Sequence, residues 1–299
     1  MIEYKNAEAG NEDGVPCVRL YGVTHFGVRE IFDCGQAFRF DPVENTGHGC
    51  EWCGVARGRF ISVASDGDDI TIYNSSMEDF DNIWKDYFAL EEDYGAYADD
   101  IRSRSDVPAL KAAVDTGRGI RILHQEPWEA LCSFIISQNN NIPRIKALVR
   151  ELSRRAGERI DVCGMEKHGA HDREYAFPSP AAVASLGEDG LRDMKTGFRA
   201  GYIYAAACAV RDGIIDQEKI KAAPTTQEAS LMLQSLRGVG PKVAACTLLF
   251  GYGRMDSFPV DVWIKKVIEK YFTGSFSPDI LGPYAGLAQQ YLFYYEREI

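Results

Sequence analysis

The stretch from residue 236 to residue 261, LRGVGPKVAACTLLFGYGRMDSFPVD, constrains the fold more than any other part of this chain. Gly238-Val239-Gly240 predicts a tight turn, because glycine adopts left-handed backbone angles and lets a second backbone approach closely. Pro241 suits the first turn of a helix, since its fixed φ is helical and its missing N–H has no intrahelical partner there. We therefore expect two helices joined by a hairpin, with the second helix over residues 242–250 and Gly251 at its end.

A lysine and an aspartate mark the two ends of the segment that follows the turn. Lys242 lies in the first turn of the expected helix, and Asp261 lies where Pro259-Val260-Asp261 leads into another helix. Lys242 alone is also compatible with a solvated lysine at a helix start. The alternative is an amine nucleophile that works with a nearby carboxylate.

The first 75 residues have the pattern of a β-sheet. Short segments rich in β-branched and aromatic residues alternate with Gly, Asn and Asp turns, which predicts antiparallel pairing. Arg57-Gly58-Arg59 and Asp66-Gly67-Asp68 are typical of hairpin connections. The expected strands are 17–21, 37–40, 51–57, 59–65 and 69–73.

After about residue 77 the apolar residues recur at helical spacing, as at Phe80, Ile83, Trp84 and Tyr87. This predicts an α+β protein, with an N-terminal antiparallel sheet domain and flanking helices over residues 1–106. A two-part all-helical core is expected over residues 107–299, with the helix-hairpin-helix at about 228–250. Gly-, Ser- and Pro-rich loops are expected at 157–178 and 273–282. The expected helices are 77–89, 94–104, 108–116, 127–138, 142–155, 180–185, 188–194, 199–212, 226–236, 242–250, 261–272 and 283–296.

The net charge and the lack of long apolar runs limit the partners and the location expected for this protein. A formal net charge of −11 argues against binding polyanions over the whole surface. Residues 139–160 nevertheless hold six basic against two acidic side chains, and residues 237–270 hold six against three, so a local basic face remains compatible with nucleic acid. No signal peptide or membrane-spanning run is expected, which indicates a cytoplasmic protein, or a nuclear one in a eukaryote.

We expect no metal bound by side chains. Only Cys50 and Cys53, among eight cysteines, form a C-x-x-C pair, and nothing nearby completes a zinc site. His168 and His171 are spaced like ligands but lie in a Gly- and charge-rich loop. The cysteines are therefore expected to be reduced thiols.

Leu236–Gly240 resembles the helix-hairpin-helix motif, in which backbone N–H groups at the turn bind a DNA phosphate. Gly238 and Gly240 would supply those groups. This motif also occurs in proteins that only bind DNA, so a non-enzymatic DNA-binding module is one alternative. The Pro259-Val260-Asp261 segment resembles the helix-hairpin-helix Gly/Pro-Asp (HhH-GPD) glycosylase superfamily. The resemblance implies that Lys242 marks a bifunctional member, which cleaves the glycosidic bond and then nicks the strand.

The more specific resemblance, over nearly the whole chain, is to the 8-oxoguanine DNA glycosylase/lyase family. Residues 282–293, GPYAGLAQQYLF, resemble its C-terminal signature. This implies that Gln289 reads the Watson–Crick edge of the flipped base and that Phe293 and Cys246 cover its two faces. The carbonyl of Gly35 would accept a hydrogen bond from the N7–H that only the oxidised guanine carries.

The resemblance also assigns a DNA-distorting group around the segment FIISQNNNIPR, residues 134–144. Asn139 would fill the gap left by the flipped base, and Phe198 would unstack its neighbours. Arg144 and Arg199 would hydrogen-bond the orphaned cytosine. The three consecutive asparagines are also compatible with two helix caps placed back to back.

Departures from the family pattern concern DNA contacts more than chemistry. Trp263 stands where the best-known members carry a histidine, and its indole N–H would reach a DNA phosphate. Phe198 stands where tyrosine is frequent, and Ala245 where aspartate is frequent. No cysteine follows Cys246, which excludes the relatives with a four-cysteine iron–sulfur cluster after the core.

The chemistry implied is attack of the Lys242 amine on the sugar C1′, formation of a Schiff base and β-elimination. Partial burial at a helix N-terminus would disfavour the charge on Lys242, and Asp261 would stabilise positive charge on the sugar. No cofactor is required, although the carbonyls of Gln234, Leu236 and Val239 could hold a monovalent cation. The expected partner is double-stranded DNA with 8-oxoguanine opposite cytosine, bound by a monomer. A glycosylase for a different damaged base is the second alternative.

Overall fold

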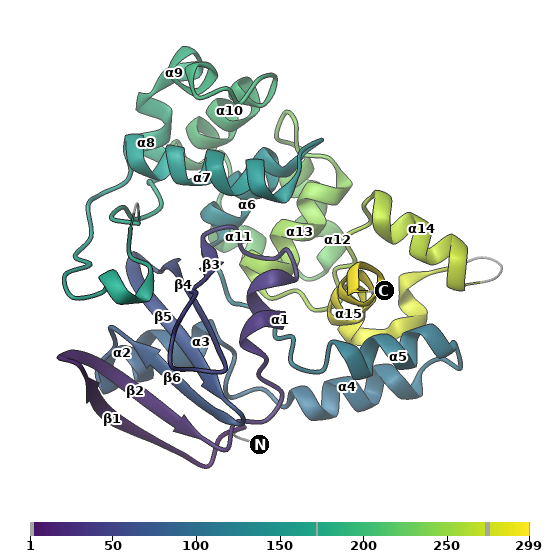
Figure 1. Ribbon diagram of the computed structural model, residues 1–299. Helices are drawn as coiled ribbons and strands as arrows, with labels where there is room; N and C mark the ends of the chain where they lie inside the picture. Colours follow the sequence, from purple (N-terminus) through teal and green to yellow (C-terminus); the bar gives the residue numbers. More distant parts are fainter. Residues whose placement is uncertain (1–2, 172, 273–275, 299) are drawn as a thin grey trace.

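The computed structural model describes residues 3–171, 173–272 and 276–298. An antiparallel sheet forms one side of the molecule, and helices form the rest (Figure 1). The yellow C-terminal helix lies beside the purple N-terminal segment that follows the first hairpin (Figure 1). Segments from both ends of the chain therefore meet in the middle of the molecule.

The sheet has six strands in the order β1-β2-β6-β5-β4-β3, and all its pairs are antiparallel, which confirms the predicted architecture. Ala56 pairs with Arg59, so Arg57 and Gly58 form the predicted two-residue turn, and both have the positive φ that such a turn requires. The strands are β1 (Asn6–Glu12), β2 (Val15–Tyr21), β3 (Phe40–Pro42), β4 (Cys50–Ala56), β5 (Arg59–Asp66) and β6 (Asp69–Tyr73).

The prediction of a strand over residues 37–40 was wrong in its position. The strand there begins only at Phe40, because the preceding segment is attached to the helical core. The side chain of Gln36 donates to the carbonyl of Arg121 at 2.8 Å and accepts from the N–H of Leu123 at 2.9 Å. This anchoring pulls the chain around Gly35 out of the sheet.

Every predicted helix has a counterpart, although several boundaries differ. The second hairpin helix passes through Gly251 and ends at Gly253, which has the left-handed φ of a helix C-cap. The helices at 28–33 and 217–221 were not predicted, and the expected loops contain short 3-10 turns; residues 172 and 273–275 of those loops lie outside the described chain. The helical elements are α1 (Val28–Asp33), α2 (Met77–Asp79), η1 (Phe80–Trp84), α3 (Lys85–Tyr87), α4 (Tyr94–Ser103), α5 (Pro108–Thr116), α6 (Pro127–Ser137), α7 (Ile142–Ala156), η2 (Glu166–His168), α8 (Pro180–Ser185), α9 (Gly187–Asp193), α10 (Arg199–Arg211), α11 (Gln217–Lys221), α12 (Thr226–Gln234), α13 (Pro241–Tyr252), α14 (Val262–Tyr271), η3 (Pro278–Tyr284) and α15 (Ala285–Glu298).

The two faces of the sheet pack against different apolar clusters. Cys50 and Cys53 lie three residues apart on β4, so their side chains point to opposite faces and join different clusters. They therefore cannot share a metal ion. His168 contacts the buried carboxylate of Glu51 at 2.7 Å, and the described residues contain no group of three or more His, Cys, Asp or Glu suited to a metal.

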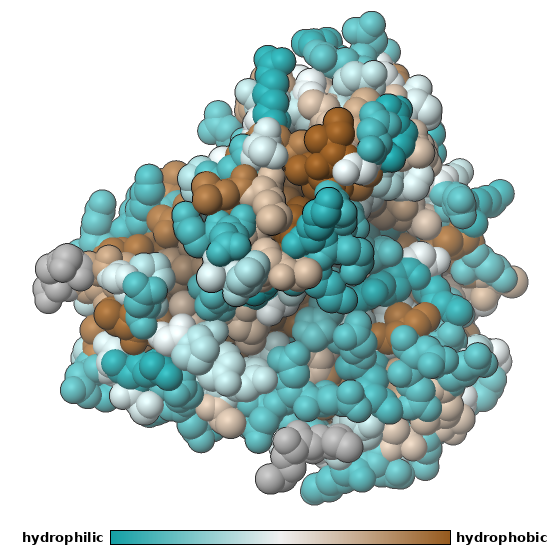
Figure 2. Space-filling model, turned by 180° about the vertical axis from the view of Figure 1, so that it is seen from behind, coloured by the Kyte–Doolittle hydropathy of each residue, from teal (hydrophilic) through white to brown (hydrophobic). Residues whose placement is uncertain are grey.

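The surface is mainly hydrophilic on the face seen from behind, where hydrophobic residues form separate groups (Figure 2). None of the described helices is both long and apolar enough to cross a bilayer.

Arg121 ties the N-terminal segment to the entrance of the helical core. Its side chain is fully buried and forms an ion pair with Glu3. Its Nε donates to the carbonyl of Phe88 at 2.8 Å, its Nη1 donates to the carbonyl of His25 at 3.2 Å, and its guanidinium lies 4.2 Å from the ring of Tyr94. One cation thus connects residue 121 with residues 3 and 25 and with the segment 88–94.

We expect Arg121→Leu to lower the free energy of unfolding by about 3–5 kcal/mol, because it removes the buried guanidinium that pairs with the buried Glu3 carboxylate. Urea unfolding followed by circular dichroism measures this change. Lys111→Ala is the matched control: it removes an exposed ion pair with Asp106 and should cost less than about 1 kcal/mol. Equal losses in the two variants would contradict the role assigned to Arg121.

Candidate active site

The two predicted catalytic residues and all four predicted base-pocket residues line one pocket. The pocket lies between α13, α15 and the segment after α1. Its lining residues are Cys34, Gly35, Phe134, Lys242, Cys246, Phe250, Pro259, Asp261, Gln289, Gln290 and Phe293.

The hairpin turn that precedes Lys242 requires glycine. Gly238 has φ +87°, and a Cβ atom there would lie 2.2 Å from the ring of Tyr202. The carbonyl of Gly238 accepts the side-chain N–H of Gln138 at 3.0 Å. The turn is therefore held against both α10 and the end of α6.

Lys242 lies in the first turn of α13, half-buried over an apolar wall. Its Nζ donates to the hydroxyl of Ser137 at 3.3 Å and lies 5.0 Å from the ring centre of Phe134. Cys246 follows one turn later on the same face, and burial raises the pKa of its thiol while Lys242 beside it acts in the opposite direction. Cys246 therefore stays a neutral thiol next to the amine.

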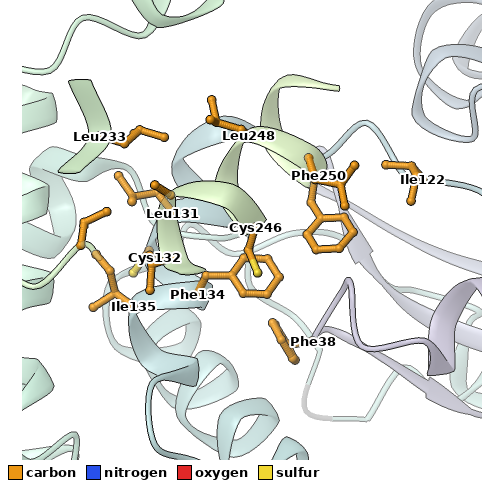
Figure 3. Close-up of a cluster of buried hydrophobic side chains, with 14 of the residues drawn as sticks. Phe38, Ile122, Leu131, Cys132, Phe134, Ile135, Leu233, Cys246, Leu248 and Phe250 are labelled. Atoms are coloured by element: carbon orange, nitrogen blue, oxygen red, sulfur yellow. The ribbon is translucent and has the colours of Figure 1, made fainter. Parts of the chain in front are cut away.

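Aromatic rings build this apolar wall. Phe134 and Phe250 stack with ring centres 5.3 Å apart, and Phe38 packs edge-on against Phe134 at 5.5 Å. Figure 3 shows these rings in the buried cluster together with Cys246. The wall excludes water from one side of the lysine.

Asp261 is the N-cap of α14. Its Oδ1 accepts the N–H of Ile264 at 2.8 Å, which fixes the carboxylate at the edge of the pocket. In the described chain Asp261 forms no ion pair with Lys242, although both line the pocket. The amine is thus near the carboxylate without being held by it.

Gly286 lets α15 reach this site, a role that the sequence reasoning missed. Its N–H donates to the carbonyl of Met255 at 2.7 Å, and a Cβ atom there would lie 2.5 Å from the carbonyl oxygen of Ser257. The segment so contacted leads directly to Asp261. Glycine inside a helix lowers helix stability by up to about 1 kcal/mol relative to alanine. Its presence in the predicted C-terminal helix was therefore a signal in the sequence of a close contact at this position.

The C-terminal helix brings Gln289 and Phe293 to the segment around Gly35. Gly35 has φ +80°, and a Cβ atom there would lie 3.5 Å from the Phe293 ring. Gln289 is buried, and its Oε1 accepts an N–H of Gln290 at 2.8 Å. Gln290 also lines the pocket and was missed as a site residue.

The four predicted DNA-distorting residues lie together beside the hairpin turn, outside the pocket. Asn139 is exposed and has a left-handed φ of +53°. Arg199 is buried and donates to the carbonyl of Asn139 at 2.8 Å. Burial, and then the charge of Arg144, lowers the pKa of Arg199. Phe198 is 54% exposed and packs edge-on against Tyr202.

The neighbouring asparagines have structural roles, as the capping interpretation proposed. Asn140 donates to the carbonyl of Ile136 at 3.1 Å, and Asn141 accepts the N–H of Arg144 at 3.0 Å as the N-cap of α7. Arg144 itself donates to the carbonyl of Lys195 at 3.1 Å. Two caps thus position Asn139 at the tip between the helices.

Two further predicted contacts remain predictions. Trp263 is 50% exposed in the first turn of α14, with Nζ of Lys266 5.2 Å from its ring. At the proposed cation site, the carbonyl of Leu236 accepts the N–H of Val239 at 3.1 Å, which leaves this oxygen one lone pair for an ion.

Comparison with known proteins shows the family of this chain. Residues 20–131 match the 8-oxoguanine DNA glycosylase N-terminal domain, and residues 132–278 match the HhH-GPD superfamily of base excision DNA repair proteins. The N-glycosylase/DNA lyase OGG1 of Arabidopsis thaliana is 33% identical over 172 residues, which cover 55% of this chain and 43% of the plant protein. The N-glycosylase/DNA lyase of Saccharomyces cerevisiae is 32% identical over 198 residues, covering 62% and 49%.

This chain therefore matches about half the length of these two relatives. A solved structure covers it almost completely: the Clostridium acetobutylicum 8-oxoguanine glycosylase/lyase, in complex with double-stranded DNA containing cytosine opposite 8-oxoguanine. It is 36% identical, with a TM-score of 0.87 over 99% of both chains. On these matches, the chain belongs to the 8-oxoguanine DNA glycosylase/lyase family of the HhH-GPD superfamily.

Proposed function

We propose that this protein excises 8-oxoguanine from double-stranded DNA, preferentially opposite cytosine, and then nicks the strand at the abasic site. The observation that carries the proposal is the single pocket in which an amine and a carboxylate meet Gly35, Cys246, Gln289 and Phe293. The division into residues 1–106 and 107–299, with the helix-hairpin-helix at about 228–250, belongs to the same proposal. The protein would act as a monomer in the nucleoid of a prokaryote or the nucleus of a eukaryote.

In the proposed reaction, a C1′–Nζ bond to Lys242 forms as the bond between C1′ and the base breaks. Asp261 stabilises the positive charge that develops on the sugar and helps to move the amine proton. Opening of the sugar ring leaves a Schiff base. Loss of a C2′ proton then expels the 3′-phosphate and breaks the strand.

Base selection depends on donors and acceptors that face the pocket. The carbonyl of Gly35 would accept from N7–H of 8-oxoguanine, whereas guanine presents a lone pair at N7 and would set two acceptors against each other. A lost buried hydrogen bond of this kind costs about 1–3 kcal/mol. Phe293 and Cys246 would cover the two faces of the base.

The DNA side of the proposal rests on the cluster beside the hairpin. Asn139 would enter the gap left by the base, Phe198 would unstack its neighbours, and Arg144 and Arg199 would pair with the orphaned cytosine. The N–H groups of the hairpin glycines and the indole of Trp263 would bind phosphates. A monovalent cation at the hairpin carbonyls would reinforce the turn.

Borohydride should trap a covalent complex between the wild-type protein and a duplex containing 8-oxoguanine, because reduction fixes the Schiff base. Lys242→Gln should abolish trapping. Lys111→Gln, which changes an exposed lysine outside the pocket, should trap like the wild type. Trapping by Lys242→Gln would refute the role of Lys242 as the nucleophile. If the wild-type protein were trapped on another lesion but not on 8-oxoguanine, it would be a glycosylase for a different base.

Asp261→Asn should separate the chemical role of this side chain from its capping role. Asparagine caps helices as well as aspartate does, so the melting temperature should change little. The single-turnover excision rate should fall about 10²- to 10³-fold, as for the loss of one electrostatic group in other enzymes. Asp261→Ala should lower both quantities, and an unchanged rate in Asp261→Asn would contradict the charge-stabilising role.

Arg144→Ala and Arg199→Ala should each relax the preference for cytosine over adenine opposite the lesion by about 10- to 100-fold. Single-turnover excision on the two duplexes measures this ratio. Arg199→Ala should also slow excision on every duplex, since its guanidinium holds the carbonyls of Gln138 and Asn139. Unchanged discrimination against adenine in both variants would contradict the proposed pairing of Arg144 and Arg199 with the orphaned cytosine.

A further inference from the structure

Gln290 is a buried polar side chain whose hydrogen bonding is incomplete. It is 4% exposed and lines the pocket next to Gln289. Its Nε2 donates to Oε1 of Gln289 at 2.8 Å. Its own Oε1 is buried and has no hydrogen-bond partner among the described residues.

The position of Gln290 on α15 directs it to the base pocket. Residues 286, 289, 290 and 293 lie on one face of this helix, and Gly286 fixes that face against the segment leading to Asp261. Tyr291, the next residue, also has a buried unpaired hydroxyl, but it does not line the pocket. Gln290 lines the pocket, so its unpaired oxygen lies beside the site, and a bound base whose N–H reached this oxygen would satisfy it.

A guanine-type base presents three groups on its Watson–Crick edge: the 2-amino donor, the N1–H donor and the O6 acceptor. A single glutamine amide can match two of them, with its oxygen on N1–H and its nitrogen on O6. Gln289 would do this, because one lone pair of its Oε1 remains after the hydrogen bond from Gln290. The 2-amino group then needs a second acceptor.

We propose that Gln290 is a specificity-determining residue, whose Oε1 accepts a hydrogen bond from the 2-amino group of the flipped base. Its Nε2 at the same time holds the oxygen of Gln289 toward N1–H, so the two amides read all three groups of the edge. This inference rests on the proposed function. The inference assigns the pocket to oxidised purines that carry a 2-amino group rather than to oxidised purines in general.

Duplexes containing 8-oxoguanine or 8-oxohypoxanthine opposite cytosine test this directly, since the two bases differ only in the 2-amino group. In single-turnover excision, the wild type should prefer 8-oxoguanine by at least about tenfold. Gln290→Met, which keeps the side-chain length without an acceptor, should lower this ratio about tenfold. Tyr291→Phe, which removes the unpaired hydroxyl of the neighbouring residue outside the pocket, is the control that should keep the preference.

The outcomes separate this inference from the proposed function. If the wild-type protein excises 8-oxoguanine and 8-oxohypoxanthine at equal rates, the inference about Gln290 is overturned and the proposed function stands. This result does not depend on the folding of any variant. A ratio unchanged in Gln290→Met overturns it too and leaves Gln290 as an orienting or packing residue. Failure of the wild type to excise either base overturns both proposals.

Discussion

The close contact between α15 and the segment that leads to α14 determines the rest of the site. At Gly286 the helix backbone hydrogen-bonds directly to Met255, and no side chain larger than hydrogen fits there. This contact sets the distance between the face of α15 that carries Gln289 and Asp261, the aspartate that caps α14. The same helix reaches the N-terminal segment at Gly35, so residues from both ends of the chain surround Lys242. The hairpin positions the amine, and the C-terminal helix positions the groups that would read the base.

A second set of hydrogen bonds connects the pocket to the cluster proposed to distort the DNA. Gln138 donates to the hairpin carbonyl of Gly238, and its own carbonyl accepts from Arg199. The loop that carries Asn139 and the turn that precedes Lys242 are therefore one connected unit. Such a connection would keep the gap-filling residue and the nucleophile at a fixed separation along the DNA.

Local patterns predicted most of the fold, because the hairpin helices, the antiparallel strands and their turns depend on nearby residues. The failures occurred where distant contacts decide. Strand β1 has no β-branched residue and forms by pairing with β2, whereas residues 37–39 leave the sheet because Gln36 binds the helical core. Family resemblance led to the predicted site residues, of which the structure brings the catalytic pair and the four base-pocket residues into one pocket. Gly286 and Gln290 escaped notice because their importance lies in contacts that no sequence pattern shows.

The central claim is that Lys242 is the residue that becomes bonded to the DNA. Mass spectrometry of the borohydride-reduced complex, after digestion with trypsin and nuclease, tests it most directly. The account predicts that the sugar adduct lies on the peptide spanning residues 238–254, which contains Lys242 and no other lysine. An adduct on any other lysine, or on the N-terminal amine, would contradict it.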